Sequence, residues 1–427
     1  MNETEGMNAK QKLGYYTQKF YDDAMAAHDK GEFVCWSSSI APSEFFRTMG
    51  IHIVYPENHA AAVGAKHGAL EILELAERKV YTMDNCSYSR INLAYMDLLV
   101  KEKVTGKTPE ALAKLDELKI PRIPLPDIII MCNNICEVLL KWYENLAVTL
   151  KVPYVVIDVP YVYEWPIPQR AIDYVEAQFK RAIKQIEDLC GKPFDYENFI
   201  KVQEQTQRSI AAWDKAMGMA SVVPSPLNGF DIFNFMALIV CARSDYASED
   251  TFTTLADELQ AKADAGIDAF KGGEKTRIAW EGIAVWPYLS HTYKALKALG
   301  TNMVGSTYPS AWSIHYEPGD LKAMAAGYIG CYYNTSLERR VDVLGGVMEN
   351  TKCTGILYHN NRSCKNMAVM NVEMAEMIRE RTKTPFASFD GDQTDPRNFS
   401  EAQFDTRVEA LAEVMEQNMA NAANQNA

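Results

Sequence analysis

Short apolar runs alternate with amphipathic stretches over much of the chain. Stretches with helical spacing of apolar residues begin at Ser43 and, after the next run, extend from about Asn58 to Arg78. Strands joined by crossover helices form parallel sheets, so this alternation predicts an α/β unit. The runs predicted as its strands are 33–36, 51–55, 127–131 and 154–158.

The same alternation returns in the last third of the chain, after a long segment of another kind. Residues 8–32 have the pattern of an amphipathic helix, and helical spacing also fills most of 169–271. The later runs predicted as strands are 277–281, 301–304, 354–358 and 385–389. We therefore expect an α/β protein with two parallel-sheet domains and a helical insert or bridge between them. The predicted boundaries are 1–32 for an N-terminal helical segment, 33–165 for the first α/β domain, 166–274 for the helical region and 275–427 for the second α/β domain.

A cysteine-containing loop occurs once in each predicted α/β domain. The segments 132–136 (CNNIC) and 359–364 (HNNRSC) each follow an apolar run and precede a helical pattern, and the strands that come next end in Asp158 and Asp390. Ligands of open parallel sheets bind beyond the carboxyl ends of the strands. If the two domains face each other, Cys136 and Cys364 converge on one cleft.

Composition and charge narrow the classes of function. The formal net charge is −13 without a concentrated basic patch, so we expect no nucleic-acid partner. No apolar run approaches the roughly 18 residues of a membrane helix, and the polar, acidic start does not resemble a signal peptide. We therefore expect a cytoplasmic protein that does not insert into a membrane. Nine dispersed cysteines argue against a disulfide framework.

Three cysteines are candidate metal ligands. Cys86 begins a predicted helix, as Cys136 and Cys364 do, and thiolates are the preferred ligands of iron-sulfur clusters. The spacing of Cys132 and Cys136 would also suit zinc. Sequence spacing leaves a cluster, zinc and inert core thiols open, and by itself it favours inert thiols.

A second group of polar residues follows the first two predicted strands. Ser37 and Ser39 come after one strand, and Glu57 and His59 come after the next. The serines could cap the helix at Ser43, or they could face a ligand. Glu57 is either a general base or part of a solvated turn, and His59 suits a core position.

Several of these segments together resemble a known family. The sequence is similar to the larger (α) subunit of 2-hydroxyacyl-CoA dehydratases, a family that includes subunits of benzoyl-CoA reductase, from about Met7 to Ala420. The segments that carry the resemblance are 34–42 (VCWSSSIAP), 132–137 (CNNICE), 141–144 (KWYE), 225–231 (SPLNGFD), 280–286 (WEGIAVW), 359–364 (HNNRSC) and 390–396 (DGDQTDP).

The resemblance implies a cofactor and a set of site residues. It implies two α/β domains with a helical portion, and a [4Fe-4S] cluster held by three cysteines with one iron open to substrate. Those cysteines match Cys86, Cys136 and Cys364, with Cys132 as the rival of Cys136. The family's active-site serine and glutamate correspond to the pair Ser37 and Ser39, between which the sequence does not choose, and to Glu57.

The resemblance also implies a reaction and partners. The family adds one electron to the thioester of a 2-hydroxyacyl-CoA, and the resulting ketyl radical anion expels the α-hydroxyl. We expect a short substrate such as lactoyl-CoA, with acryloyl-CoA as the product. The implied partners are a smaller β subunit and an ATP-dependent iron-sulfur activator protein that binds transiently. A bound flavin is left open. The sequence identifies no CoA-binding residue, although a basic residue such as Arg90 could meet the CoA phosphates.

Two other classes of function remain open at this point. One is a subunit like that of benzoyl-CoA reductase, which reduces an aryl-CoA. The other is a non-catalytic scaffold subunit whose cysteines only stabilise it.

Overall fold

Two four-stranded parallel sheets form the scaffold of the protein in a computed structural model that describes residues 3–271 and 273–425. The first sheet contains β1 (Val34–Ser37), β2 (His52–Val54), β3 (Ile128–Cys132) and β4 (Tyr154–Ile157). The second contains β5 (Thr276–Glu281), β6 (Thr301–Ser306), β7 (Gly355–Asn361) and β8 (Phe386–Gly391). All eight predicted strands are present, so the predicted α/β fold class with two parallel sheets is confirmed.

The two sheets share one strand order. It is β2-β1-β3-β4 in the first sheet and β6-β5-β7-β8 in the second. In each sheet the second strand lies on one side of the first strand, and the third and fourth strands lie on its other side. The connections after the first and third strands therefore lead in opposite directions. The loops that follow β1 and β3, and likewise β5 and β7, therefore lie at a topological switch point, where ligands of such sheets bind.

Seventeen α-helices surround the sheets in the described part of the chain. Those before the second sheet are α1 (Ala9–Asp29), α2 (Ser43–Met49), α3 (Pro56–Ala65), α4 (Ala69–Arg78), α5 (Ser87–Thr105), α6 (Glu110–Glu117), α7 (Glu137–Leu150), α8 (Gln169–Cys190), α9 (Tyr196–Gly218), α10 (Gly229–Cys241) and α11 (Tyr246–Asp264). The later ones are α12 (Leu289–Ala298), α13 (Leu321–Ile329), α14 (Leu337–Thr351), α15 (Lys365–Ala368), α16 (Asn371–Thr382) and α17 (Glu401–Gln425).

One predicted helix is interrupted. The stretch 58–78 forms two helices, because the chain leaves the helical conformation after α3: His67 has a positive φ of 60°, and Gly68 precedes α4. Glu57 lies in the first turn of α3, where it is buried, and the solvated turn considered from the sequence is therefore excluded.

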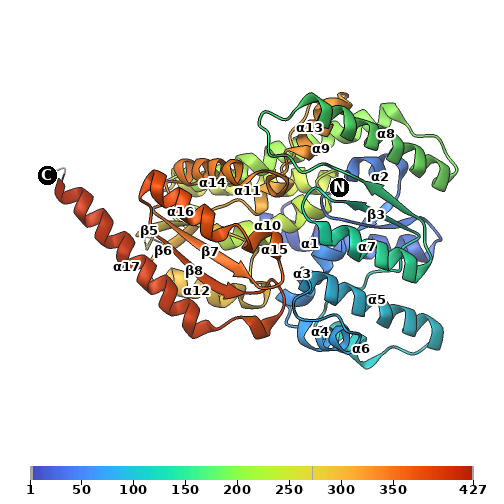
Figure 1. The fold of residues 1–427 in the computed structure, drawn as a ribbon, viewed down its shortest axis with the longest axis horizontal. Coiled ribbons are helices and arrows are strands. Elements are labelled where there is room, and N and C mark those ends of the chain that lie inside the picture. The colour runs from blue at the N-terminus through green and yellow to red at the C-terminus, as the bar shows by residue number, and fades with distance from the viewer. Residues whose placement is uncertain (1–2, 272, 426–427) are drawn as a thin grey trace.

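The main hydrophobic core runs without a break from one sheet to the other. It contains Ile130 of β3, Trp280 of β5 and the buried faces of α8 to α11. Figure 1 shows the first sheet at the right and the second at the left, with α10 and α1 between them. Because this core is shared, the predicted domain boundaries stay a prediction. Residues 1–2, 272 and 426–427 fall inside the predicted segments but lie outside the described residues.

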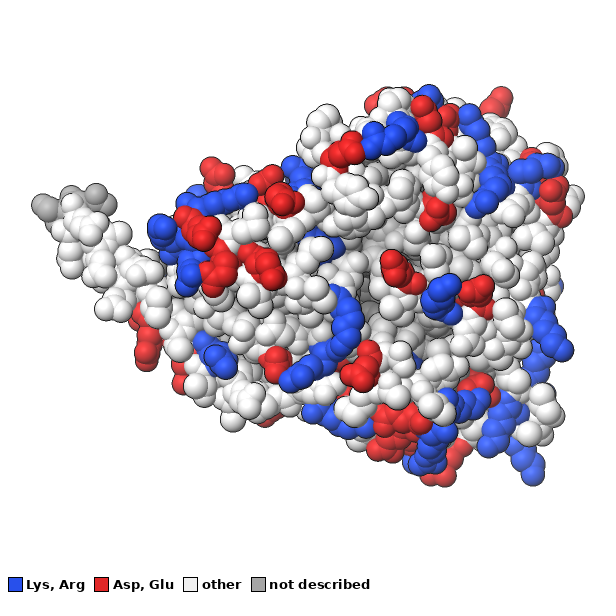
Figure 2. Space-filling view, in the orientation of Figure 1, with Lys and Arg blue, Asp and Glu red and all other residues white. Residues whose placement is uncertain are grey.

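Acidic and basic side chains are mixed over the face seen in Figure 2, which is hollowed where the two halves of the molecule meet. Within residues 3–271 and 273–425, no helix is long and apolar enough to cross a membrane.

Candidate active site

Three cysteines from three helix starts line one cavity. Cys136 is the N-cap residue of α7, Cys364 that of α15 and Cys86 that of α5. The cavity they share has a volume of about 100 Å³. Cys136 and Cys364 follow the third strand of their sheets, so the convergence expected from the repeated loop is present in the structure.

The thiols are surrounded by hydrogen-bond donors. Removal from water raises the pKa of all three, to about 12 for Cys364, where the adjacent Cys136 adds to the effect. Backbone N–H groups of α7 and α15 act in the opposite direction at Cys136 and Cys364. The side-chain amide of Gln393 donates to Cys86 Sγ at 3.4 Å. Donors to sulfur act against the effect of burial and would help to stabilise thiolates that bind a metal.

Three thiolates can act as ligands of a multi-iron cluster. Within residues 3–271 and 273–425, no group of three or more His, Cys, Asp or Glu side chains is arranged so that it could hold a metal ion. The thiolates of a [4Fe-4S] cluster each bind a different iron, so they need not surround a single point. Cys86, Cys136 and Cys364 are the residues that would hold such a cluster.

Cys132 lies outside this cavity. It is the last residue of β3, its side chain is fully buried in the main core, and its backbone N–H donates to Ser38 Oγ at 2.9 Å. The structure therefore separates Cys132 from the three thiols that face one another.

Glu57 of α3 and Ser39, in the loop after β1, border the same cavity. Glu57 Oε1 accepts hydrogen bonds from the backbone N–H of Ser39 at 3.0 Å and from its hydroxyl at 3.1 Å. Ser37 does not line the cavity, and its hydroxyl donates to the carbonyl oxygen of Ser38. Of the two serines considered from the sequence, Ser39 is the one that the structure places beside Glu57 and the cysteines.

Tyr143 is a partner for Glu57 in either protonation state. Its hydroxyl oxygen lies 2.5 Å from Glu57 Oε2 and 3.0 Å from the carbonyl oxygen of Ser37. When Glu57 is ionised, the hydroxyl donates to it. When Glu57 is protonated, its O–H donates to Tyr143, and Tyr143 donates to Ser37. Glu57 can thus gain and lose a proton without leaving a buried group unpaired.

Replacing Tyr143 with phenylalanine is expected to raise the pKa of Glu57. Burial already raises this pKa, and the hydrogen bond from Tyr143 is the largest influence that lowers it. Infrared difference titration of the carboxyl band, with Glu57→Gln as the blank, measures the change. Tyr95→Phe, which alters another buried tyrosine, is the control. A Glu57 titration that is the same in Tyr143→Phe and wild type would contradict the assigned contact.

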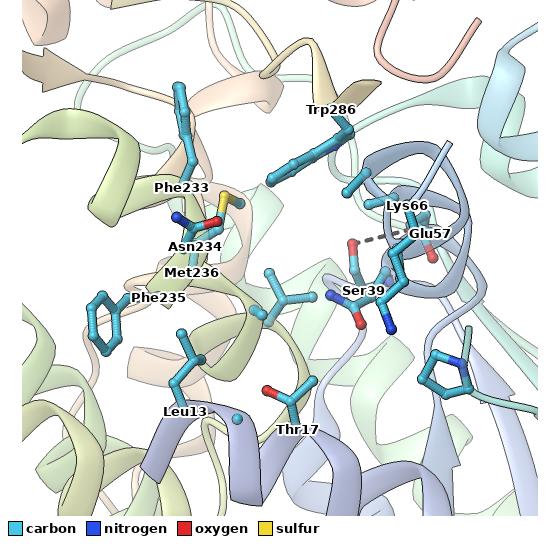
Figure 3. A pocket seen from close by; sticks show the side chains of 18 of the residues that line it. Leu13, Thr17, Ser39, Glu57, Lys66, Phe233, Asn234, Phe235, Met236 and Trp286 are labelled. Atoms are coloured by element: carbon cyan, nitrogen blue, oxygen red, sulfur yellow. Dashed lines mark hydrogen bonds between the residues drawn. The ribbon is translucent and has the colours of Figure 1, made fainter. Parts of the chain in front are cut away.

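A larger cavity of about 520 Å³ adjoins the first. The two share Ser39, Glu57, Tyr88, Tyr308 and Trp312 in their walls. Figure 3 shows this larger space, with Leu13 and Thr17 of α1 and Asn234 and Met236 of α10 across from Ser39 and Glu57. A molecule that fills the larger cavity can therefore bring one end to the three cysteines.

Two tyrosines at the shared wall were not identified from the sequence. Trp286 Nε1 donates to the Tyr88 hydroxyl at 2.5 Å, and Tyr88 is hydrogen-bonded in turn to Tyr308. Both tyrosines line the wall that the two cavities share. Trp286 lies in one of the recognisable segments, but neither tyrosine does, so no sequence signal identified them.

Polar contacts join the Cys86 loop to the second half of the chain. Ser87 Oγ donates to Asp392 Oδ1 at 2.6 Å and accepts from Thr394 Oγ1 at 2.7 Å. The backbone N–H of Ser87 donates to Ser363 Oγ at 3.1 Å. A Cβ atom on Gly64 of α3 would lie 2.6 Å from Thr394, so the two halves also pack closely there. These contacts between the two halves are referred to as the seam. They hold Cys86 in a fixed position relative to Cys364.

Arg90 does not meet the expectation for a CoA contact. Its side chain is fully buried and is paired with Asp395 at 3.0 Å and with Glu77 at 2.9 Å. It belongs to the seam between the two halves, and its charge is already neutralised.

Comparison with known proteins gives one consistent family. The family described as 2-hydroxyglutaryl-CoA dehydratase, D-component, matches residues 38–415. The chain is 53% identical to lactoyl-CoA dehydratase subunit alpha of Anaerotignum propionicum over 99% of this chain and 100% of that one. It is 41% identical to the (R)-2-hydroxyisocaproyl-CoA dehydratase alpha subunit of Clostridioides difficile over 93% of each. A benzoyl-CoA reductase polypeptide of Thauera aromatica is 24% identical over 86% of this chain and 85% of that one. The chain therefore belongs to the family of the 2-hydroxyglutaryl-CoA dehydratase D-component.

Proposed function

We propose that this chain is the α subunit of an oxygen-sensitive (R)-2-hydroxyacyl-CoA dehydratase. The reaction removes water from a short 2-hydroxyacyl-CoA such as lactoyl-CoA and gives a 2-enoyl-CoA such as acryloyl-CoA. The observation that carries the proposal is the junction of the two cavities, where Glu57 and Ser39 adjoin three thiols. The 53% identity to a lactoyl-CoA dehydratase subunit over nearly the whole chain supports the choice of a short acyl group.

The chemistry explains why such a site needs both a redox cofactor and a carboxyl group. The β-hydrogen of a 2-hydroxyacyl thioester is hardly acidic, so a base alone cannot start the elimination. Reduction to a ketyl radical allows the α-hydroxyl to leave and makes the β-hydrogen far more acidic. When bound by Cys86, Cys136 and Cys364, a [4Fe-4S] cluster supplies the one-electron and Lewis-acid chemistry.

Glu57 is the group assigned to proton transfer. Burial favours its protonated form, while Tyr143 and Ser39 stabilise the ionised form by donating to its oxygens. These opposing influences leave both forms accessible, as a group that passes a proton requires. Glu57 assists the loss of hydroxyl or accepts the β-proton.

Ser39 and Tyr308 are assigned to orienting the substrate. The Ser39 hydroxyl borders both cavities, and a rotation takes it from Glu57 Oε1 to an oxygen of the substrate. Tyr308 borders both cavities, where its hydroxyl is proposed to donate to an oxygen of the substrate. Ile283, Trp312 and Met367 line the cysteine cavity with apolar surface and exclude water from it.

The active form is proposed to be a complex. The relatives are named as α subunits, which supports a smaller β subunit as the lasting partner. An ATP-dependent iron-sulfur activator is proposed to deliver the electron and then to dissociate.

The direct test is an anaerobic assay of the complex purified with its β subunit and supplied with activator and ATP. Lactoyl-CoA is expected to be converted to acryloyl-CoA, and benzoyl-CoA to remain unchanged. Reduction of the aryl-CoA alone would favour the reductase alternative. Activity that persists in both Glu57→Gln and Cys364→Ser would favour a scaffold subunit.

Ser39→Ala is expected to lower kcat/KM for the dehydration by about 10²-fold, because it removes a donor at the reacting end of the cavity and one support of Glu57. Ser37→Ala is the matched control and should change it little, since the Ser37 hydroxyl donates to the Ser38 carbonyl and does not line the cysteine cavity in the described part of the chain. Steady-state kinetics on both variants decide between the serines. A larger loss in Ser37→Ala would reverse the assignment.

A further inference from the structure

Hydrogen bonds hold Ser39 on both sides of its backbone. Its N–H group and its hydroxyl donate to Glu57 Oε1, and Figure 3 shows the contact between the two side chains. Its carbonyl oxygen accepts from Arg243 Nη1 at 3.0 Å and from Trp312 Nε1 at 3.2 Å. The orientation of Ser39 at the cavities therefore depends on two donors that are far from it in the sequence.

The guanidinium of Arg243 binds two carbonyl groups of the loop after β1 at once. In addition to the Ser39 contact, its Nη2 donates to the carbonyl oxygen of Ala41 at 2.5 Å. A guanidinium presents its N–H groups in a rigid planar fork, whereas lysine has a single ammonium group on a flexible stem. Arg243 can therefore fix the positions of Ser39 and Ala41 together, as a lysine could not.

Arg243 also ties this loop to a wall of the larger cavity. It follows the end of α10 by two residues, and its Nη1 donates to the carbonyl oxygen of Val240, in the last turn of that helix, at 3.3 Å. Val240 lines the larger cavity, as do Phe233 and Met236 of the same helix. Arg243 thus sets the position of Ser39 relative to the wall that a bound molecule would contact.

The charge of Arg243 lies in the protein interior. The residue is only 1% exposed. Burial acts against its charge, whereas the nearby Tyr328 and Glu44 favour the charge, and the pKa of Arg243 is raised on balance. Burying a guanidinium costs free energy that a neutral side chain would avoid. The two carbonyl groups that the fork holds give a reason for an arginine at this position.

We propose that Arg243 is a positioning residue, which holds the carbonyl groups of Ser39 and Ala41 and so keeps the Ser39 hydroxyl at the junction of the two cavities. This role rests on the proposed function, in which Ser39 contacts the substrate. Arg243 itself lines neither cavity and acts through Ser39.

Infrared difference titration of Glu57 in the purified complex tests the role without turnover. Both donors of Ser39 lower the pKa of Glu57, so a displaced Ser39 should raise it. Arg243→Lys and Arg243→Gln, neither of which keeps the fork, are expected to raise the pKa of Glu57 above its wild-type value. Arg277→Lys is the matched control, because Arg277 is also buried and donates to the carbonyl oxygen of Ala220. It should leave the titration unchanged.

A double-mutant cycle separates positioning from a general structural effect. Arg243→Lys is expected to lower kcat/KM for the dehydration by about tenfold or more, since small displacements of a reacting group are costly. In the Ser39→Ala background the same substitution should cause a much smaller loss, because the hydroxyl that Arg243 positions is already absent.

Three results would overturn the role of Arg243 while leaving the proposed function intact. They are an unchanged Glu57 titration in both Arg243 variants, an equal change in Arg277→Lys, and losses of kcat/KM that simply add in the cycle. A wild-type complex that does not dehydrate lactoyl-CoA would instead contradict the proposed function, and the titration would still report whether Arg243 positions Ser39.

Discussion

Replacing Cys364 with serine is expected to remove bound iron from the purified complex and to lower turnover by about 10³-fold or more. A serine hydroxyl is a poor substitute for a soft thiolate ligand, and no other cysteine besides Cys86 and Cys136 lines this cavity among the described residues. The measurements are iron and sulfide content, the EPR signal of the reduced complex, and turnover, all under anaerobic conditions. The same losses are expected for Cys86→Ser.

The pair Cys136→Ala and Cys132→Ala separates the two cysteines of the first loop. Cys136→Ala should lose iron, whereas Cys132→Ala should retain it, because Cys132 is enclosed in the main core. Cys190→Ala, on α8, controls for the loss of any thiol. Iron that is retained in Cys136→Ala but lost in Cys132→Ala would exchange the roles proposed for these residues.

Replacing Glu57 with glutamine is expected to lower kcat by about 10²- to 10⁴-fold while iron content stays unchanged. The amide cannot pass a proton, but it preserves the local hydrogen bonds: its oxygen accepts from Ser39, and its N–H group donates to Tyr143, which then donates to Ser37. Steady-state kinetics and iron analysis of the same preparation separate loss of chemistry from loss of the site.

The same substitution should change how stability depends on pH. An unfolded glutamate loses its proton at about pH 4.3, whereas burial raises the pKa of Glu57 in the folded protein. Folding then favours the protonated form, so wild-type stability is lost as pH rises from that value through the raised pKa. Glu57→Gln lacks this loss, and its Tm relative to wild type should therefore increase with pH across that window.

Glu281→Gln is the matched control for both effects. Burial raises the pKa of Glu281 as well, and its carboxyl accepts from Thr307 and Tyr332, but it lines neither cavity. It should show the same pH trend in Tm without the loss of kcat. A Glu57→Gln enzyme with wild-type kcat would remove Glu57 from the proposed mechanism.

The alternating pattern was sufficient to predict the sheets but not every helix boundary. Strands such as β3, which is buried along its whole length, appear in the sequence as continuous apolar runs between helical patterns. The break between α3 and α4 depends on the left-handed backbone conformation of His67. This local change does not alter the spacing of the apolar residues, so the pattern did not predict the break. Periodicity records which side of an element is buried and does not report a local change of backbone.

The candidate site was only partly predictable from the sequence. The repeated loop indicated that Cys136 and Cys364 would converge, but spacing could not distinguish a ligand from a core thiol. That distinction depends on whether a residue ends a strand, as Cys132 does, or caps a helix, as Cys136 does. Tyr308 and Gln393 lie in loops that are far apart in the sequence and have no motif in common. Only the packing of the two halves brings them to the same cavity.

The seam between Ser87 and Asp392 has a consequence for how the protein matures in the cell. Cys86 and Cys136 are synthesised early, but Cys364 and the seam residues emerge only near the end of translation. A growing chain cannot form the three-thiol site, so the proposed cluster would be inserted only after the residues around Cys364 have been synthesised and the two halves have docked. The free energy of cluster binding would then stabilise the contact between the two halves. Iron-starved cells should accumulate a full-length precursor whose halves separate more readily, detectable as faster proteolysis of the segments around residues 86 and 364.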